Sequence, residues 1–573
     1  MSWFYPYKPG VVLGLTEAAH MLQMHVRLDG SLSKVRQHLD HETEREWEVR
    51  KIMQVYIDDE KREIPEFESS TTPPPWRHQG IAWHWGMRVT ALYLQHKMGL
   101  GKTREGADIV RGKYDHGQAF APIQTWLPER ASRAQPDKTL PERHGTKHGV
   151  LVVCPAGVMV EWLQQLKRWQ GIEALPIVGT PERKRMRAGT PAWVHVVSYE
   201  SLGAVEDNEY DGIIADELHY AANEDSNRFP RLWAVRERAR WVVGLSGTPQ
   251  TNGLTSLWAQ YYFLDGGRTL GSTYQAFKRK YFNKETKHLL PEGGAEEAIT
   301  HAISRISWPY SMQQAFKDKP QKIHQTIRVP MTAAQVRYYE IIRKEQEADI
   351  VTGKVSLFDA MNRLTKLMQV TQGFVLDNDK VVQQFSSAKL DALQEMLGPK
   401  GDLHDKRVIV WCNFSAEVVM ISNMLKKLGK RHLILRGGLS QNAKTLLKDE
   451  WNENYQHEVL VGMISMGIGL NLHAPKCVDD KGRPARVSTT VFYGWNWRVS
   501  VLEQAMDRTY RGDQVETCLY RYLLSDDLEE SDGSGKRVQP IDVRVYESLM
   551  AKLEQGVRVD ENSIAYVRSL LAA

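Results

Sequence analysis

Residues 96–103 read His-Lys-Met-Gly-Leu-Gly-Lys-Thr, a glycine-rich turn that ends in Lys-Thr. In such a turn the backbone N–H groups can surround a polyphosphate, Lys102 can reach the terminal phosphates, and the Thr103 hydroxyl can complete the shell of a bound Mg²⁺. The full pattern has glycine at its first position, where this chain has His96. Taken alone, the motif favours a nucleotide site over an ordinary turn before a helix, and the surrounding sequence has to decide.

Upstream of this phosphate loop, a Ser-Ser-Thr-Thr-Pro-Pro-Pro linker at 69–75 is followed by Gln79. A glutamine amide can donate to and accept from the adenine edge at once, so Gln79 predicts selection of ATP over GTP. We therefore expect ATP and Mg²⁺ as cofactors. In this part of the chain, the residues predicted to bind them are Gln79, Met98, Gly99, Leu100, Gly101, Lys102 and Thr103.

Length and composition set the broad class of protein. A chain of 573 residues exceeds what one hydrophobic core normally serves, which predicts two large units with attachments. The net charge of +5 allows a polyanionic partner without requiring one. The four cysteines form no CxxC pair, which favours a reducing compartment and no structural zinc. We expect no membrane segment, and a cytoplasmic protein of a bacterial cell or virus-infected host, or a nuclear one in a eukaryote.

Apolar stretches downstream of the loop predict parallel strands separated by helices. One of them ends in Asp216 and Glu217, and open α/β sheets place their chemistry at the carboxyl ends of strands. Asp216 suits the holding of Mg²⁺ through water, and Glu217 suits polarising the water that attacks the phosphate. The pattern predicts a RecA-like P-loop lobe of α/β class. Its expected strands are 150–155, 193–197, 212–216 and 241–245.

The flanking regions carry weaker patterns. Before the linker we expect short strands at 11–15 and 24–28 and a helix over 32–56 with Ser31 as its N-cap. Residues 265–385 read as helical and mixed, with helices at 277–282, 295–306, 333–350 and 357–370. A second set of buried strands is expected at 407–413, 433–435 and 459–461, and closing helices at 543–554 and 561–571.

The ordered motifs resemble the SWI/SNF-type (Snf family) superfamily 2 DNA-translocating ATPases, in particular a small bacterial or viral type. The resemblance rests on Gln79, MGLGKT, LVVCPA…EW, VVSYESL, DELH and LSGTPQTNGLTSLW, with QAMDRTYRGDQ at 504–514. It implies two tandem RecA-like P-loop lobes with helical insertions and a small N-terminal accessory domain. The chain departs from the family where His96-Lys97 replaces the usual Asp-Glu, and where Ile464 replaces an arginine.

The resemblance also implies roles for residues outside the phosphate loop. Arg508 and Arg511 are three residues apart, and we expect them on a helix, where such a pair points the same way. They correspond to the arginine fingers that a second lobe directs toward the γ-phosphate, and such a finger is typically worth about 10³–10⁵ in rate. The implied catalytic set is Lys102, Asp216, Glu217, Arg508 and Arg511, with Gly469 as a further nucleotide contact. The implied nucleic-acid contacts are Pro155, Ala156, Ser198, Tyr199, Gly437, Ser465, Asn471 and Trp497, with Trp495 as the alternative tryptophan. Coupling between the two sites is assigned to Ser246, Thr248 and Gln504.

These features together predict an ATP-dependent double-stranded DNA translocase that remodels protein–DNA complexes or DNA junctions, acts as a monomer and has an unidentified protein partner. Two alternatives remain open: a strand-separating DNA or RNA helicase of the same superfamily, and a nucleic-acid-binding scaffold that has lost catalysis. The expected domains are an accessory domain (1–70), the first lobe (71–265), helical protrusions and linker (266–385), the second lobe (386–525) and a C-terminal helical brace (526–573).

Overall fold

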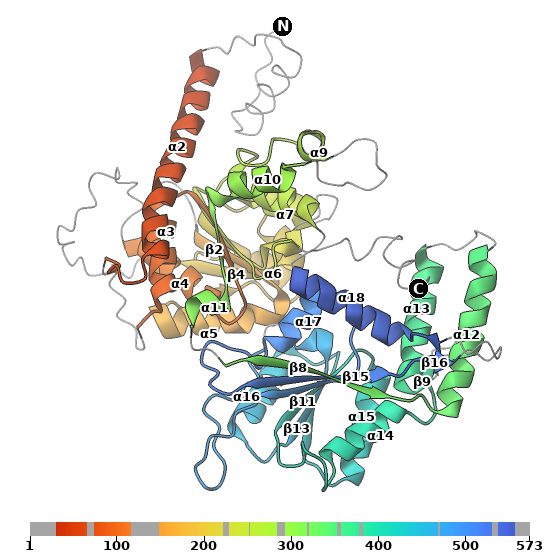
Figure 1. The fold of residues 1–573 in the computed structure, drawn as a ribbon. Coiled ribbons are helices and arrows are strands. Elements are labelled where there is room, and N and C mark those ends of the chain that lie inside the picture. Colours follow the sequence, from red (N-terminus) through yellow and green to blue (C-terminus); the bar gives the residue numbers. More distant parts are fainter. Residues whose placement is uncertain are drawn as a thin grey trace. The chain divides into compact units, whose positions relative to one another are not determined.

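In a computed structural model, the chain forms two compact units, Met1–Ala315 and Phe316–Ala573. Each unit is built on one parallel sheet with helices packed on it (Figure 1), which confirms the predicted α/β class and the two tandem lobes. The structure describes residues 30–65, 74–115, 148–221, 228–250, 253–282, 293–317, 320–351, 357–376, 382–467, 470–529 and 537–555.

The first unit has a seven-stranded sheet in the order β3-β4-β2-β5-β6-β1-β7, and all its neighbouring strands are parallel. Four of these strands, β2, β4, β5 and β6, are the predicted ones, whereas β1, which leads into the phosphate loop, was not predicted. The strands are β1 Ala91–His96, β2 His148–Cys154, β3 Leu175–Pro176, β4 Val194–Ser198, β5 Tyr210–Asp216, β6 Trp241–Leu245 and β7 Ser307–Tyr310.

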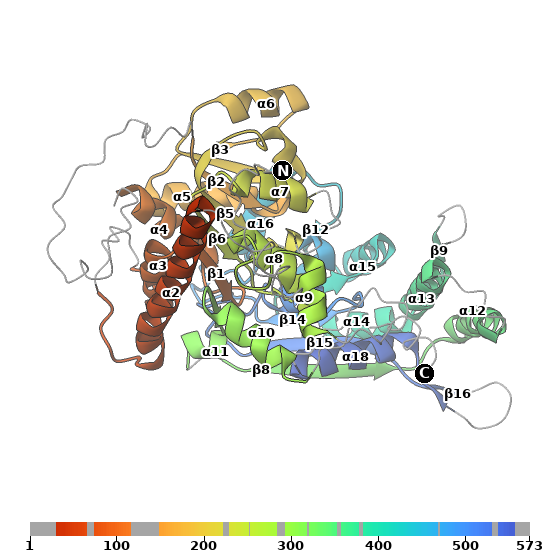
Figure 2. The ribbon, with the colours of Figure 1, turned by 90° about the horizontal axis from the view of Figure 1, so that it is seen from above.

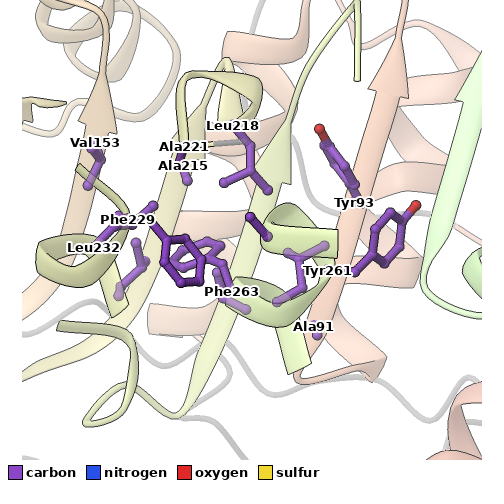
Figure 3. Close-up of a cluster of buried hydrophobic side chains, with 14 of the residues drawn as sticks. Ala91, Tyr93, Val153, Ala215, Leu218, Ala221, Phe229, Leu232, Tyr261 and Phe263 are labelled. Carbon is purple, nitrogen blue, oxygen red and sulfur yellow. The ribbon is translucent and has the colours of Figure 1, made fainter. Parts of the chain in front are cut away.

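Helices cover both faces of this sheet, because alternate residues of each buried strand point to opposite faces. Leu92 and Leu94 of β1 pack with α2 to α5, and Ala91 and Tyr93 pack with α7 to α10. Figure 3 shows Tyr93 beside Tyr261 in the second of these clusters. The helices are α2 Gly30–Asp58, α3 Arg77–Arg88, α4 Lys102–Asp115, α5 Met159–Gln170, α6 Pro181–Gly189, α7 Arg228–Arg236, α8 Leu257–Asp265, α9 Tyr274–Tyr281, α10 Ala295–Ser304 and α11 Met312–Ala315.

The N-terminal helix α2 packs against α3 and belongs to the core of the first unit. Its buried Glu46 lies 2.9 Å from Arg268 and 3.4 Å from Arg305, so ion pairs join α2 to the segments that follow α8 and α10. The helix begins at Gly30, so Ser31 lies inside its first turn and the prediction of Ser31 as N-cap was wrong. The strands expected at 11–15 and 24–28 lie outside the described residues.

The second unit has a six-stranded sheet in the order β12-β13-β11-β14-β15-β8, again with all neighbours parallel. Its helices include α12 and α13, which lie side by side (Figures 1 and 2). The strands are β8 Lys322–Val329, β11 Val408–Cys412, β12 His432–Leu435, β13 Val459–Met463, β14 Thr489–Phe492 and β15 Cys518–Ser525. The helices are α12 Ala333–Val351, α13 Leu357–Gln372, α14 Ala388–Leu397, α15 Ser415–Lys427, α16 Gln441–Glu453, α17 Val499–Met506 and α18 Ile541–Gln555.

The stretch expected to form protrusions and a linker is divided between the two units. The helices predicted there are present as α9, α10, α12 and α13, but the first two belong to the first unit and the last two to the second. The same stretch also supplies an edge strand to each sheet, because β7 pairs with β1 and β8 pairs with β15 along its whole length.

The C-terminal helix α18 is held to the second unit by a buried ion pair. Lys389 Nζ of α14 lies 2.7 Å from the carboxylate of Asp542, which also accepts a 2.9 Å hydrogen bond from the Ser525 backbone N–H. The helix expected at 561–571 lies outside the described residues. Among the helices that the structure describes, none is both long and apolar enough to cross a bilayer.

Candidate active site

The phosphate loop connects the end of β1 to the start of α4. Gly99 and Gly101 have φ angles of 85° and 78°, in the left-handed region that favours glycine. A Cβ atom on Gly101 would lie 2.4 Å from the Gln79 amide nitrogen, so this position also needs glycine for lack of space. The backbone therefore bends tightly into the N-terminus of α4, where helix N–H groups and the helix dipole favour an anion.

Lys102 is the first residue of α4 and is buried. Its Nζ donates a 2.8 Å hydrogen bond to the carbonyl oxygen of His96, so the ammonium lies inside the curve of the loop. A Cβ atom on Gly247, beyond the end of β6, would lie 3.4 Å from this Nζ. Thr103 follows in the first turn of α4 and is half-buried. The structure thus brings the loop lysine next to the Ser246-Gly247-Thr248 segment.

Gln79 lies in the first turn of α3, directly beside the loop. Its Oε1 accepts a 2.9 Å hydrogen bond from the Trp76 backbone N–H, and its Nε2 donates a 3.3 Å hydrogen bond to the Leu100 carbonyl. Both ends of the amide are therefore engaged within the protein. The assignment of Gln79 to adenine stays a prediction, because those hydrogen bonds must open before its amide can bind a base.

Asp216 is the last residue of β5, and three groups hold it. The Trp162 indole donates a 2.8 Å hydrogen bond to Oδ2, the Glu217 backbone N–H donates a 3.0 Å bond to Oδ1, and the Tyr199 hydroxyl donates to the Asp216 carbonyl at 2.9 Å. Burial, with the adjacent Glu217 charge, raises the pKa of Asp216 to about 6. A divalent cation at this carboxylate would favour its ionised form. Trp162 was not predicted as a site residue.

Glu217 adopts a φ angle of 50°, which is strained for a residue with a side chain. Its Oε2 lies 3.3 Å from His219 Nδ1, and the same ring nitrogen lies 2.9 Å from Ser246 Oγ. The Ser246 hydroxyl oxygen in turn accepts a 3.1 Å hydrogen bond from the Thr248 backbone N–H. His219, which was not predicted as a site residue, therefore links the acidic pair at the end of β5 to the hydroxyl segment after β6.

These contacts follow from the strand order. β5, β6 and β1 are neighbours in the sheet and run parallel, so their carboxyl ends lie at one edge. The loop lysine, the acidic pair and the hydroxyl segment each follow one of these strands. The geometry provides a buried ammonium, two carboxylates and a helix N-terminus, which are the groups needed to bind and hydrolyse a nucleoside triphosphate.

The predicted nucleic-acid contacts of the first unit differ in exposure. Pro155, Ser198 and Tyr199 are buried, and the Ser198 hydroxyl donates to Ser201 within the protein. Ala156, at the start of a short 3-10 turn, is exposed. Any contact made here would use Ala156 and main-chain groups rather than the hydroxyls of Ser198 and Tyr199.

In the second unit, Gly437 is exposed after β12, and Ser465 and Asn471 are half-buried near the glycine loop. Trp497 is also half-buried, whereas Trp495 is 1% exposed and packs on the rings of Tyr522 and Tyr546. Of the two tryptophans, only Trp497 retains exposed surface for a ligand. Gly469 lies outside the described residues.

The two predicted arginines lie beyond α17, which ends at Met506, so the expectation that they share a helix face was wrong. They converge for another reason. Arg508 Nη1 and Arg511 Nη2 donate to the same carbonyl oxygen, that of Leu470, at 2.9 and 3.2 Å. Arg508 Nε also donates to the backbone oxygen of Gln504 at 2.8 Å, and Gln504 is itself buried.

Comparison with known proteins decides the family. Residues 76–374 match the SNF2-related domain, and residues 388–513 match the helicase conserved C-terminal domain. The chain belongs to the SNF2-related family. The family resemblance inferred from the motifs is therefore confirmed, and the chain carries the ATPase, helicase-like core of that family.

Several relatives are similar over most of this chain. Protein p41 of Acyrthosiphon pisum secondary endosymbiont phage 1 is 24% identical over 485 residues, covering 80% of this chain and 94% of that protein. DNA repair and recombination protein RAD54-like of Danio rerio is 22% identical over 518 residues, covering 80% of this chain and 64% of that protein. The solved Sulfolobus solfataricus SWI2/SNF2 ATPase core in complex with dsDNA has 16% identity and a TM-score of 0.39, covering 89% of this chain and 97% of that one.

The SNF2-related chain spans different shares of its relatives. It covers nearly all of the phage protein but less than two thirds of the Danio rerio protein. It covers 26% of the protein CHROMATIN REMODELING 5 of Arabidopsis thaliana, which is 24% identical over 467 residues.

Proposed function

We propose that this SNF2-related protein is an ATP-driven translocase on double-stranded DNA that remodels protein–DNA complexes or DNA junctions. The observation that carries the proposal is the juxtaposition of Lys102, the Asp216-Glu217 pair and Ser246 at the ends of three adjacent strands. The similarity to a RAD54-like protein of Danio rerio, whose name states DNA repair and recombination, supports a DNA substrate.

ATP fits the first unit by shape and charge. Gly99 and Gly101 let the loop bend tightly into the N-terminus of α4, whose N–H groups can bind phosphate oxygens, and the buried Lys102 ammonium can pair with terminal phosphates. Mg²⁺ fits the donor set of the Thr103 hydroxyl and the Asp216 carboxylate, and it would neutralise charge on the phosphates. Glu217, oriented beside His219, would align the attacking water and accept its proton.

Arg508 and Arg511 would complete hydrolysis by stabilising charge on the γ-phosphate. Each now donates to the neutral Leu470 carbonyl, and a phosphate oxygen is a stronger, charge-assisted acceptor. Because these arginines belong to the second unit and the phosphate loop to the first, hydrolysis would depend on movement between the units. That dependence is how ATP turnover can drive stepping along DNA.

DNA binding would rely mainly on main-chain and small-residue contacts to the phosphate backbone, as expected for sequence-independent binding. Ala156 and Gly437 are exposed, so their main-chain groups could contact phosphates, and Trp497 is partly exposed. The chain from Glu217 through His219 to Ser246 and Thr248 would transmit DNA binding to the catalytic carboxylate.

The direct test measures ATP hydrolysis by the purified full chain alone and with duplex DNA, single-stranded DNA, a forked junction or RNA. We expect strong stimulation by duplex DNA, and a loss of about 10²–10⁴ in rate for Glu217→Gln because the variant lacks the general base. Glu173→Gln removes an exposed carboxylate that pairs with Lys167 and serves as the matched control.

A second measurement separates translocation from strand separation. Triplex displacement reports movement along an intact duplex, and unwinding of a forked duplex reports helicase action. We expect triplex displacement with little unwinding. Unwinding without triplex displacement, or stimulation by RNA alone, would overturn the translocase proposal in favour of a strand-separating helicase.

A further inference from the structure

Two histidines and a glutamate form a buried cluster beneath the phosphate loop, on the side away from Asp216. His78 comes from α3, His96 is the last residue of β1, and Glu105 lies in the first turn of α4. Their exposed fractions are 3%, 0% and 0%. One donor atom from each residue lies within 4.8 Å of the other two, and this is the only such His/Cys/Asp/Glu group found among the described residues.

The distances in this histidine–glutamate cluster are near those between ligands of one metal ion, although the shortest of them is also a hydrogen-bond distance. His96 Nδ1 lies 2.9 Å from Glu105 Oε1, and His78 Nε2 lies 3.7 Å from the same oxygen. In a tetrahedral zinc site with bonds of about 2.0–2.1 Å, the ligand atoms stand roughly 3.3–3.5 Å apart. The observed spacings lie on either side of that value, so small side-chain shifts would suffice.

Two polar atoms of the cluster are buried without a hydrogen-bond partner: Glu105 Oε2 and His96 Nε2. Buried polar atoms are normally satisfied, and an unpartnered carboxylate oxygen in an apolar site is costly. Because Oε2 belongs to the same carboxylate as Oε1, an ion bound in a bidentate manner would satisfy it. Hydrogen bonding within the cluster therefore leaves Glu105 Oε2 available to a cation, whereas His96 Nε2 is directed away from an ion held by Nδ1 of the same ring.

The surroundings suit a closed site. The rings of Trp308 and Tyr310, from β7, pack against His96 with centroids 4.7 and 5.6 Å away, and Tyr310 also packs against His78 at 5.3 Å. The Leu100 carbonyl oxygen lies 2.9 Å from His78 Nε2, close enough to take a fourth position. An apolar shell of this kind excludes water and strengthens binding of an ion to its ligands.

We propose that His78, His96 and Glu105 bind a Zn²⁺ ion that fastens the phosphate loop to the first sheet. Two imidazoles and a carboxylate are a known zinc donor set, whereas Mg²⁺ prefers oxygen ligands alone. The ion would join α3, β1 and α4 and would fix His96, whose carbonyl oxygen holds the Lys102 ammonium. Cysteine spacing does not reveal this site because none of its ligands is a cysteine.

The inference does not depend on the proposed function, since metal binding is measured without nucleotide or DNA. The full chain is stripped with a chelator and titrated with Co²⁺ by absorption, and Zn²⁺ affinity is obtained by competition with a chromophoric chelator. We expect one tightly bound ion per chain. In Glu105→Gln and in His78→Gln we expect affinity to fall by at least about 100-fold, because each variant removes a ligand.

The matched control is His195→Gln. His195 is also fully buried in the first sheet, but it is bonded to the Tyr210 hydroxyl at 2.8 Å and to the Thr190 carbonyl at 3.0 Å. We expect this variant to bind the ion with wild-type affinity. Binding that persists in both ligand variants, or a wild-type protein that takes up no ion, would overturn the proposal.

A measurement on the wild-type protein covers the case in which the ligand variants do not fold. X-ray absorption of the Zn²⁺-loaded chain is expected to show two imidazoles at about 2.0–2.1 Å and no sulfur ligand. Fewer than two imidazoles, or a sulfur shell at about 2.3 Å, would assign the ion to other residues and refute the site.

Discussion

Asp216 in the first unit is held by the Trp162 indole, whereas Arg508 and Arg511 in the second unit are both held by the main-chain oxygen of Leu470. The first arrangement depends on a side chain that is distant in sequence but in contact in the fold. One substitution at that position can therefore change the pKa of the carboxylate without changing the fold. The second depends on the position of a loop, and no substitution removes a carbonyl. The difference separates a site tuned by chemistry from one set by backbone geometry.

The largest expected effect comes from the second arrangement. Arg511→Ala should lower DNA-stimulated ATP hydrolysis by about 10³–10⁵, because the γ-phosphate loses a charged donor. Arg511 is half-buried, so thermal unfolding and ATP binding should change little. Steady-state hydrolysis and nucleotide binding are measured side by side.

Two further variants sharpen this result. Arg511→Lys should not restore activity, since lysine lacks the planar fork of donors. Arg508→Ala should lose stability as well as activity, because Arg508 is 1% exposed and bonded to two carbonyls. If Arg511→Ala retains more than about a tenth of the wild-type rate, the finger assignment, whose expected loss is about 10³ or more, is wrong.

The next largest effect concerns the pKa of Asp216. Burial raises the pKa of Asp216 to about 6, and the Trp162 hydrogen bond opposes that rise. Trp162→Phe removes a bond to a charged group worth about 1.5–3 kcal/mol, which corresponds to a further rise of roughly one to two pKa units. Since protonated Asp216 cannot hold Mg²⁺, the acid limb of the rate–pH profile should move to higher pH by that amount.

The variant should therefore be about fivefold to fiftyfold slower near pH 6 and close to wild type near pH 9, where Asp216 is ionised in both proteins. Trp85→Phe is the control, because Trp85 is equally buried in the same cluster of apolar side chains and its indole N–H has no hydrogen-bond partner among the described residues. Equal displacement of both profiles would show that lost packing, rather than the hydrogen bond, shifts the acid limb.

The same contrast explains what sequence patterns could and could not predict. Strands β2, β4, β5 and β6 follow from apolar runs, and the candidate catalytic carboxylates follow from their place at a strand end. The contact between Trp162 and Asp216 joins residues far apart in the chain, so no local period encodes it. His219 is adjacent to the acidic pair and could have been noticed from the DELH sequence.

In the second unit, periodicity predicted the right outcome for the wrong reason. Arg508 and Arg511 do converge, but α17 ends at Met506 and a shared carbonyl brings them together. Likewise β8, which was read as part of a mixed helical segment, becomes an edge strand because β15 pairs with it. Pairing partners of edge strands are long-range choices that the local sequence does not contain.

The smallest expected effect concerns Ser246, which makes one side-chain contact and one main-chain contact. Its Oγ lies 2.9 Å from His219 Nδ1 and accepts a 3.1 Å hydrogen bond from the Thr248 backbone N–H. Ser246→Ala removes both neutral hydrogen bonds, each worth about 1 kcal/mol. If the segment couples DNA binding to hydrolysis, the DNA-stimulated rate should fall by roughly fivefold to tenfold, and the rate without DNA by less.

Ser256→Ala is the control for this last measurement, since Ser256 is similarly buried but its hydroxyl donates to the Gly253 carbonyl, at 2.7 Å, and makes no described contact with His219 or Thr248. It should leave the ratio of stimulated to unstimulated rates unchanged. An equal fall of both rates in Ser246→Ala would mean that Ser246 supports Glu217 through His219 alone. DNA binding would then have to affect hydrolysis through movement of the main chain. Arg508 and Arg511 are already held in this way, because both donate to the main-chain oxygen of Leu470.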